Sequence, residues 1–388
     1  MYFLLIILLV FMIAGIVEYQ HHLRNVKKIP IRIQVNGTRG KSSVTRLIAG
    51  GLRAGGIKVI AKTTGTKPRF IINDKEEIPI KRLGKPNIGE EKMIFRQAVK
   101  YQPQAIVMEC MALVPEYQWT EANRLVKSTH CVITNARADH LDVMGPTVID
   151  VAKALSNTIT KNAKFFTAEQ KYLDIFKDRA KKLNTEVFVS NPNSVSDEDM
   201  KGFSYVEHKE NVALALLVCE SLGVDKKTAL QGMYQTTPDP GVMRIYQIKD
   251  QGKQFRLVNT LAANDPDSIL LLWEQVKNLA NEKIVLVNCR DDRADRSIQL
   301  GELTAKKFEA DWYLATGFLT MPYIRKAISL GIPKHKIVDL GEKTPEQIYQ
   351  KVLSLVKSDA LVFATGNTVG FGETIIAYFA SKGGEIDY

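Results

Sequence analysis

A glycine-rich turn between a predicted strand and a predicted helix is the first stretch whose residue types could do chemistry. Ile31, Ile33 and Val35 alternate with polar residues, as a short strand does. Residues 37–42 (GTRGKS) then turn the chain, and residues 42–55 have the pattern of a helix. Backbone N–H groups of such a turn converge on phosphate oxygens, and the helix N-terminus favours an anion. The sequence therefore predicts a phosphate-binding loop; the alternative is an ordinary tight turn.

Two side chains of this loop are suited to a bound nucleotide. Lys41 would reach the terminal phosphates, and Ser42 would supply a hydroxyl ligand to Mg²⁺. Glu109 follows residues 105–108, which have the composition of a buried parallel strand. Because ligands of α/β proteins bind at the carboxyl ends of the strands, this carboxylate could complete the Mg²⁺ coordination beside Ser42. The alternative for Glu109 is a solvated loop carboxylate.

A second polar cluster follows another predicted strand, at residues 130–134. Asp139, His140 and Asp142 come shortly after that strand, and all three side chains can hold a metal ion. Lys153, on a predicted helix, would by itself be taken for surface charge. The cluster is a candidate metal site, and a structural role for the histidine is the alternative.

Alternating strands and helices must position these residues. Further strands are predicted at 57–62, 165–167, 187–189, 255–259, 284–288, 312–315 and 361–364, with helices between them. The charged segment 73–89 is expected to be a surface excursion, and the Pro/Gly cluster at 236–241 separates two series of elements. This pattern predicts an α/β protein, with a parallel-sheet ATP-binding domain at 29–240 and a smaller Rossmann-like α/β domain at 241–388.

The N-terminal segment 2–17 is an unbroken apolar run. A helix of this length spans roughly 24 Å, slightly less than the roughly 30 Å hydrocarbon core of a bilayer, and local thinning tolerates a short span. No basic residue precedes the run, which argues against a cleaved signal peptide. Arg24, Lys27 and Lys28 follow it, so the positive-inside rule predicts a cytoplasmic body. We expect residues 1–28 to form an uncleaved single-span anchor and its linker.

Composition limits the classes of partner. The 388 residues, 45% hydrophobic, can bury two ordinary cores. The net charge of +11 favours anionic partners such as lipid headgroups, nucleotide phosphates or an acidic substrate, with a solvated basic surface as the alternative. The basic residues form no nucleic-acid-binding motif, so we expect no nucleic acid partner. The 4 cysteines form no Cys-x-x-Cys pair, which favours buried, reduced thiols over disulfides or zinc.

The order and spacing of these motifs resemble the Mur ligase superfamily, which includes the ligases of peptidoglycan precursors and folylpolyglutamate synthase. The resemblance rests on residues 37–42, Glu109, residues 134–142 (TNARADHLD) and Lys153. With the N-terminal anchor and the segments 63–66 (TTGT), 86–89 (PNIG) and 264–268 (NDPDS), the chain is most similar to the ATP-dependent ligase subunits of bacterial poly-γ-glutamate synthases. The similarity covers essentially the whole chain.

The resemblance implies roles for individual residues. Ser42 and Glu109 would hold a first Mg²⁺ or Mn²⁺ ion, and His140 would help to hold a second. Lys153 matches a lysine that is carbamylated in many relatives, which turns a cation into a carboxylate-like metal ligand. The implied catalytic residues are Lys41, His140 and Lys153, and the implied nucleotide-binding residues are Gly37, Thr38, Arg39, Gly40, Lys41, Ser42, Ser43, Asn211 and Arg244. Candidate substrate-binding residues are Thr64, Thr66, Asn264, Arg290 and Arg293.

Several of these positions depart from the family pattern. His208 stands where the relatives' Asn-x-x-Asn helix has its first asparagine, and Asn264 stands where they have a histidine. Arg244 is displaced relative to the interdomain Gly-Arg segment. Arg290 and Arg293 lie in a charged loop, which could bind phosphate or substrate carboxylates or could be an ordinary charged loop. The roles of these residues are therefore less well defined than those of the phosphate loop.

The implied activity is an ATP-dependent γ-glutamyl ligase. ATP would phosphorylate the terminal carboxylate of a growing poly-γ-glutamate chain, and the amine of an incoming glutamate would then displace phosphate. The expected partners are glutamate, the polymer, lipids of a bacterial cell membrane and other membrane subunits of a synthase and export complex for capsule or secreted polymer. The alternatives are a folylpolyglutamate-synthase-like ligase for another acid, a membrane-tethered nucleotide switch or transport ATPase, and a scaffold with a degenerate nucleotide site.

Overall fold

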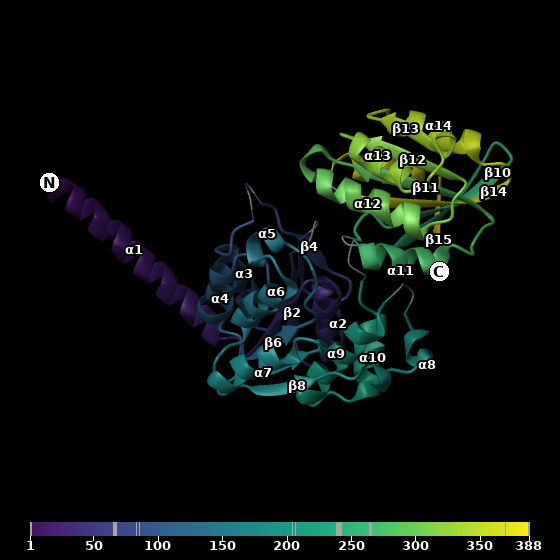
Figure 1. The fold of residues 1–388 in the computed structure, drawn as a ribbon. Coiled ribbons are helices and arrows are strands. Elements are labelled where there is room, and N and C mark those ends of the chain that lie inside the picture. Colours follow the sequence, from purple (N-terminus) through teal and green to yellow (C-terminus); the bar gives the residue numbers. More distant parts are fainter. Residues whose placement is uncertain are drawn as a thin grey trace. The chain divides into compact units, whose positions relative to one another are not determined.

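The computed structural model describes residues 2–64, 68–82, 84, 86–203, 205, 207–237, 243–263, 266–368 and 370–386. The chain divides into two compact units, one of residues 1–203 and 207–239 and the other of residues 204–206 and 240–388. Each unit contains a sheet with helices packed against it (Figure 1). The predicted α/β class is confirmed. The predicted boundary at residue 240 lies outside the described residues.

A mixed sheet of 8 strands in the described residues is the frame of the first unit. Its order is β4 (Glu77–Pro79), β3 (Arg69–Ile71), β2 (Val59–Thr63), β5 (Ala105–Glu109), β1 (Ile31–Asn36), β6 (His130–Ile133), β7 (Lys164–Thr167) and β8 (Glu186–Val189). The six neighbouring strands β2, β5, β1, β6, β7 and β8 are parallel to one another. At the edge next to β2, β3 pairs antiparallel with β2 and β4 pairs antiparallel with β3. β5 is buried along its whole length, as its continuous apolar run predicts for a strand covered on both faces.

The helices of this unit cover the sheet and form its connections. They are α2 (Lys41–Ala54), α3 (Glu90–Ala98), α4 (Pro115–Thr120), α5 (Leu141–Met144), α6 (Val148–Leu155), α7 (Leu173–Lys182), α8 (Asp197–Met200), α9 (Lys209–Ser221) and α10 (Lys226–Tyr234), with short helical turns at Val99–Tyr101, Glu121–Val126, Ser156–Thr158 and Pro192–Ser194. A Cβ on Gly232 would lie only 2.2 Å from the backbone oxygen of Gly50, so glycine lets α10 pack closely on α2. This contact helps to fix the helix that follows the phosphate loop.

Helix α1 (Tyr2–Lys27) combines an exposed apolar part with an end that packs on the first unit. Its segment Leu5–Lys27 is long and apolar enough to cross a membrane, although the same length and composition also fit a signal sequence. Near its end, His22 Nε2 lies 2.8 Å from Leu125 O, and Lys92 Nζ donates to Glu18 Oε2 at 2.8 Å. In the described residues, the hydrogen bonds that join α1 to the first unit therefore come from its last turns.

A second mixed sheet, with 7 strands in the described residues, organises the other unit. Its order is β13 (Ile337–Gly341), β12 (Trp312–Gly317), β11 (Glu282–Cys289), β14 (Asp359–Gly366), β10 (Lys253–Asn259), β9 (Arg244–Asp250) and β15 (Gly383–Ile386). β9 pairs antiparallel with β10 on one side and with β15 on the other. The helices are α11 (Pro266–Val276), α12 (Ala294–Lys307), α13 (Met321–Ser329), α14 (Pro345–Leu355) and α15 (Phe371–Ala380), with short turns at Asp291–Arg293 and Lys334–Lys336. Two buried clusters, one around Trp273 and one around Phe255, form its core.

Every strand predicted from the sequence is present, with small changes at the ends, but five strands were not predicted: β3, β4, β9, β13 and β15. β4 lies inside segment 73–89, which was expected to be a surface excursion only. β4 and β15 are mostly exposed, so they lack the apolar run that marks a buried strand. Exposed strands of this kind are defined by backbone hydrogen bonds to a neighbouring strand, and the periodicity of a sequence does not reveal those bonds.

Candidate active site

Two glycines give the phosphate loop its shape. Gly37 and Gly40 have φ angles of 129° and 78°, which are rarely accessible to other residues. A Cβ on Gly37 would lie 2.0 Å from Thr134 Oγ1, and one on Gly40 would lie 2.6 Å from Asn211 Oδ1. Both glycines are therefore needed for backbone conformation and for the close approach of neighbouring side chains.

Asn135 holds the centre of the loop from the end of β6. Its Oδ1 accepts hydrogen bonds from Thr38 Oγ1 at 2.6 Å and from the backbone N–H of Arg39 at 3.1 Å, and its Nδ2 donates to Arg39 O at 3.2 Å. Thr134 Oγ1 also donates to Arg39 O, at 2.5 Å. Residues 134 and 135 belong to the sequence motif that carried the family resemblance, but only the structure shows that they fix the loop.

Ser42 and Glu109 meet where β5 ends and α2 begins. Ser42 Oγ donates to Glu109 Oε2 at 2.8 Å, and the backbone N–H of Thr64 donates to the same oxygen at 2.7 Å. Glu109 is only 3% exposed. Lys41 Nζ donates to the backbone oxygen of Gly37 at 2.8 Å. A hydroxyl, a buried carboxylate and a lysine are thus concentrated at the N-terminus of α2, where the helix dipole also attracts phosphate.

The oxygen atoms of Ser42 and Glu109 fit the ligand preference of Mg²⁺. They are adjacent, and the carboxylate receives only two hydrogen bonds among the described residues, so lone pairs remain for a cation. The residues present therefore fit a magnesium ion bound together with nucleotide phosphates. Their assignment as metal ligands stays a prediction.

His140 and Lys153 lie in a different environment. Asp139 pairs with Arg39 at 3.4 Å and lies 3.8 Å from His140 Nε2. The Lys153 side chain is 65% exposed, and its nearest acidic partner is Asp150 at 4.0 Å. Within the described ranges, no hydrogen bond or ion pair joins His140 or Lys153 to Ser42 or Glu109, and no group of three or more His, Cys, Asp or Glu side chains could hold a metal. Their role at a second cation stays a prediction.

Asn211 and a carboxylate that the sequence did not indicate lie beside the loop. Asn211 Nδ2 donates to Glu207 Oε1 at 2.9 Å, and Ser43 also hydrogen-bonds to Glu207. Burial raises the pKa of Glu207, whereas the hydrogen bonds from Asn211 and the His208 backbone oppose that rise. Glu207 therefore connects Asn211 to the start of α2. A glutamate just before a helix is too common in sequences to reveal such a role.

A buried ionic cluster supports the loop that follows Glu109. Lys62 Nζ donates to Glu91 Oε1 at 2.5 Å, and the Glu121 carboxylate accepts from the backbone N–H groups of Met111 at 3.2 Å and Ala112 at 3.1 Å. Burial, with nearby Glu91 adding to it, raises the pKa of Glu121 to about 8. Glu121 thereby holds the chain directly after the candidate metal ligand. The sequence did not indicate this cluster, because its members come from distant segments.

The other predicted site residues give a mixed result. Arg244 Nη1 lies 3.2 Å from Glu385, and Arg290 pairs with Asp292 through two bonds of 2.9 and 2.7 Å. Arg293 is exposed. Thr66 and Asn264 lie outside the described residues. Roles of these residues in binding nucleotide or substrate stay predictions.

Comparison with known families identifies the chain. The Mur ligase middle domain family matches residues 35–237, and the family described as poly-gamma-glutamate synthase CapB C-terminal domain matches residues 245–382. The chain belongs to the Mur ligase family, in its CapB branch. The predicted family membership is therefore confirmed.

Two curated relatives match almost the whole chain. The protein is 38% identical over 381 residues to PGA synthase CapB of Bacillus subtilis (strain 168), a match that covers 97% of each chain. It is 40% identical over 384 residues to the capsule biosynthesis protein CapB of Bacillus anthracis, covering 97% of this chain and 82% of the relative. These identities extend the family assignment across both units and α1.

Solved structures of more distant proteins share the fold. E. coli FolC in complex with DHPP and ADP superposes with a TM-score of 0.64 at 15% identity, covering 93% of this chain and 90% of the other. A bifunctional folylpolyglutamate synthase/dihydrofolate synthase with Mn, AMPPNP and L-glutamate bound gives 0.65 at 14% identity, covering 93% and 92%. MurF from Acinetobacter baumannii gives 0.66 at 14% identity, covering 94% and 79%. At these identities the similarity establishes the fold.

Proposed function

We propose that this CapB-type protein is an ATP-dependent γ-glutamyl ligase that extends poly-γ-glutamate. The observation that carries the proposal is the set of hydrogen bonds that joins Ser42, Glu109 and Thr64 at the phosphate loop. The curated relatives that match nearly the full length of the chain are named for PGA synthesis and capsule biosynthesis. The junction supplies what phosphoryl transfer needs, and the relatives' names indicate the acid that receives the phosphoryl group.

The reaction has two steps. The terminal carboxylate of the polymer attacks the γ-phosphorus of ATP, the bond to ADP breaks, and an acyl phosphate forms. The free amine of a glutamate then attacks the carbonyl carbon, so that a C–N bond forms, phosphate leaves and the nitrogen loses a proton. Phosphorylation is needed because an unmodified carboxylate would have to expel oxide, which is a very poor leaving group.

Residues of the phosphate loop position and stabilise the transferring group. The loop N–H groups and the N-terminus of α2 bind phosphate oxygens, and Lys41 exchanges its bond to Gly37 for the β- and γ-phosphates. Asn135 keeps the loop in one conformation, so little reorganisation is needed when ATP binds. A Mg²⁺ ion held by Ser42 and Glu109 would neutralise charge on the phosphates.

The finer points of the site belong to the same proposal. His140 and a carbamylated Lys153 would hold a second cation, Asn211 and Arg244 would bind the nucleotide, and the acidic substrates would contact Thr64, Arg290 and Arg293. Residues 29–240 would form the ATP-binding domain and residues 241–388 the second ligase domain. The division of the chain into two compact units supports this division of labour.

We propose that α1 anchors the protein in a bacterial membrane with the catalytic body in the cytoplasm. Exposed apolar side chains along the first part of α1 support the span, and Arg24, Lys27 and Lys28 after it support the orientation. The partners would be membrane lipids and other membrane subunits that export the polymer. Protease accessibility of the C-terminus in right-side-out and inverted vesicles tests the orientation; cleavage in intact right-side-out vesicles would contradict it.

The deciding experiment measures ATP turnover by membrane-embedded protein with Mg²⁺, glutamate and a poly-γ-glutamate primer, with hydroxylamine present as a trap. A ligase releases ADP and phosphate only with the acid substrates and yields a hydroxamate from the acyl phosphate. If dihydropteroate or another small acid replaces the polymer efficiently, the folylpolyglutamate-synthase-like alternative is preferred. ATP hydrolysis that ignores glutamate and gives no hydroxamate would instead indicate a nucleotide switch or transport ATPase.

A further inference from the structure

Helix α1 runs beside α3 and in the same direction. Lys92 Nζ, in the first turn of α3, donates to Glu18 Oε2 at 2.8 Å. About one turn further along both helices, the ring of His22 lies 5.5 Å from the ring of Phe95. The order of these contacts shows that the N-terminal ends of α1 and α3 point to the same side of the first unit.

That side is the edge of the sheet that carries the phosphate loop. Glu90 and Glu91, the first two residues of α3, pair with Lys62 near the carboxyl end of β2 at 3.3 and 2.5 Å. The parallel strand β5 follows α3 and starts at the opposite edge, so α3 runs from the carboxyl ends of the strands to their amino ends. Because α1 runs with α3, the part of α1 before Glu18 projects from the carboxyl edge, where Glu109 lies.

The apolar part of α1 fixes where a bilayer would begin. If residues 2–17 cross the hydrocarbon, Glu18 lies at its boundary, and the headgroup layer beyond it is about 5–8 Å thick. Thr64, whose N–H holds Glu109, follows Lys62 by two residues, which is about 7 Å along the strand direction toward the same side. The edge that carries the candidate active site therefore faces the bilayer.

Beside α1, the start of α3 and the connection before it present basic and apolar side chains. Arg82 Nε donates to Glu90 Oε2 at 2.7 Å, which ties the connection to the start of α3. Lys81 is exposed next to this pair, and Met93 is 48% exposed. Lys81, Lys92 and Met93 are called the α3 surface below. Their level with Glu18 places them where headgroups would lie.

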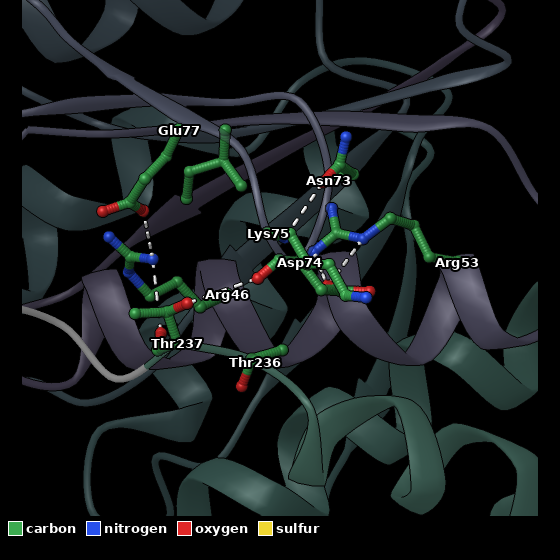
Figure 2. Close-up of a pocket in the computed structure, with 9 residues that line it drawn as sticks. Arg46, Arg53, Asn73, Asp74, Lys75, Glu77, Thr236 and Thr237 are labelled. Carbon is green, nitrogen blue, oxygen red and sulfur yellow. Dashed lines mark hydrogen bonds and ion pairs between the residues drawn. The ribbon is translucent and has the colours of Figure 1, made fainter.

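Acidic residues near the α3 surface are mostly paired within the protein. The two glutamates that begin α3 have side chains only 7% and 0% exposed. In the β3–β4 hairpin, Arg46 Nη1 donates to Glu77 Oε2 at 2.8 Å, and Arg53 Nε donates to Asp74 Oδ1 at 2.9 Å (Figure 2). The exposed residues 75 and 76 are a lysine and a glutamate, which offset each other. The α3 surface therefore keeps its positive charge.

We propose that the first unit docks on a bilayer with anionic headgroups through the α3 surface, with the phosphate-loop edge turned toward the lipid. The inference rests on the proposed anchor α1 and goes beyond it, because a tether alone requires no contact between the catalytic body and lipid. Anionic headgroups attract lysines close to the surface, and the Met93 side chain can enter the boundary of the acyl chains. A polymer made at this edge would start beside the membrane that it must cross.

The test measures the depth of single positions in the full-length protein, incorporated into nanodiscs of anionic lipid. Pro86→Cys, Met93→Cys and Lys161→Cys each carry a fluorescent label, and part of the lipid carries a nitroxide quencher on its headgroup. Pro86 is exposed in the connection before α3, whereas Lys161 is exposed before β7, at the amino edge of the sheet. The 4 native cysteines are buried, so the unsubstituted protein measures the background labelling. Thermal unfolding identifies any variant that fails to fold.

We expect the nitroxide lipid to quench the labels at positions 86 and 93 and to leave the label at 161 unchanged. Neutral lipid should weaken the quenching at 86 and 93. With the label at position 93, Lys81→Gln should lower the ratio of docked to undocked protein about fivefold, as the loss of one lysine near an anionic surface implies. Lys161→Gln removes the same charge from the opposite edge and should leave this ratio unchanged.

Three results would overturn the proposal. Equal fluorescence at all three positions would exclude docking, and quenching at 161 without quenching at 86 and 93 would exclude the orientation. Quenching at 93 that ignores both neutral lipid and Lys81→Gln would exclude the anionic headgroups as the partner. Failure of the anchor looks different, because the protein would then not co-elute with nanodiscs, and docking would fail with it. The ligase proposal is read separately, from glutamate-dependent ADP release by the same nanodiscs.

Discussion

Replacement of Glu109 by glutamine tests the candidate metal site most directly. One carboxylate oxygen accepts hydrogen bonds from Ser42 Oγ at 2.8 Å and from the Thr64 N–H at 2.7 Å, and the side chain is 3% exposed. Glu109→Gln keeps the size and one acceptor oxygen but removes the negative charge. The substitution therefore separates the electrostatic role of this residue from its role in packing.

The size of the effect follows from these two bonds. A hydrogen bond to a charged group contributes about 1.5–3 kcal/mol, and a neutral one about 0.5–1.5 kcal/mol. Exchanging two charged bonds for neutral ones therefore costs about 2 kcal/mol, or about 30-fold in an equilibrium constant. We expect the Mg²⁺ concentration for half-maximal ATP turnover to rise by at least about tenfold, since an anionic ligand is also lost, and turnover at saturating Mg²⁺ to fall.

The assay is ADP release at saturating ATP, glutamate and primer over a Mg²⁺ titration, for wild type, Glu109→Gln and the control Glu186→Gln. Glu186 lies exposed on β8, so its loss removes the same charge without touching the site. Unfolding by urea checks that the variants fold. If Glu109→Gln has the wild-type Mg²⁺ dependence and turnover, Glu109 does not hold the metal and the assignment fails.

Three further substitutions test separate parts of the structure. Lys41→Ala should abolish ATP turnover, because it removes the cation that we place at the β- and γ-phosphates. Retained turnover in the ADP assay would refute the loop assignment. Lys153→Ala should be weakly active and partly rescued by small carboxylic acids if the lysine is carbamylated. Wild-type ATP turnover in this variant would show that Lys153 is an ordinary charged surface residue. His130 is 8% exposed, and burial, with Lys164 and Arg32 adding to it, lowers its pKa to about 4. Between pH 6.5 and about 4 the unfolded chain binds a proton that the folded chain excludes, so wild type should lose stability as the pH falls through this window. His130→Phe should not share that loss, and the difference in urea unfolding between pH 7 and 5 should be about 2 kcal/mol; equal losses would contradict the assignment.

Segments with strong local patterns were predicted correctly from the sequence. The apolar run at 105–108 became β5, and the turn at 37–42 joins β1 to α2. The β3–β4 hairpin was missed because its strands are short and β4 is largely exposed, so pairing at the sheet edge, which no local pattern records, defines them.

The sequence by itself determined the family, the α/β class and the residue types of the phosphate loop, because those depend on local order and spacing. Only the tertiary structure decided which side chains act together. Parallel pairing of β1 with β5 and β6 brings Glu109 to Ser42 and Asn135 to Arg39, across separations of 67 and 96 residues. Burial then makes Lys62, Glu91 and Glu121 partners. A hydrogen bond depends on distance in space, and that distance is fixed when the sheet forms.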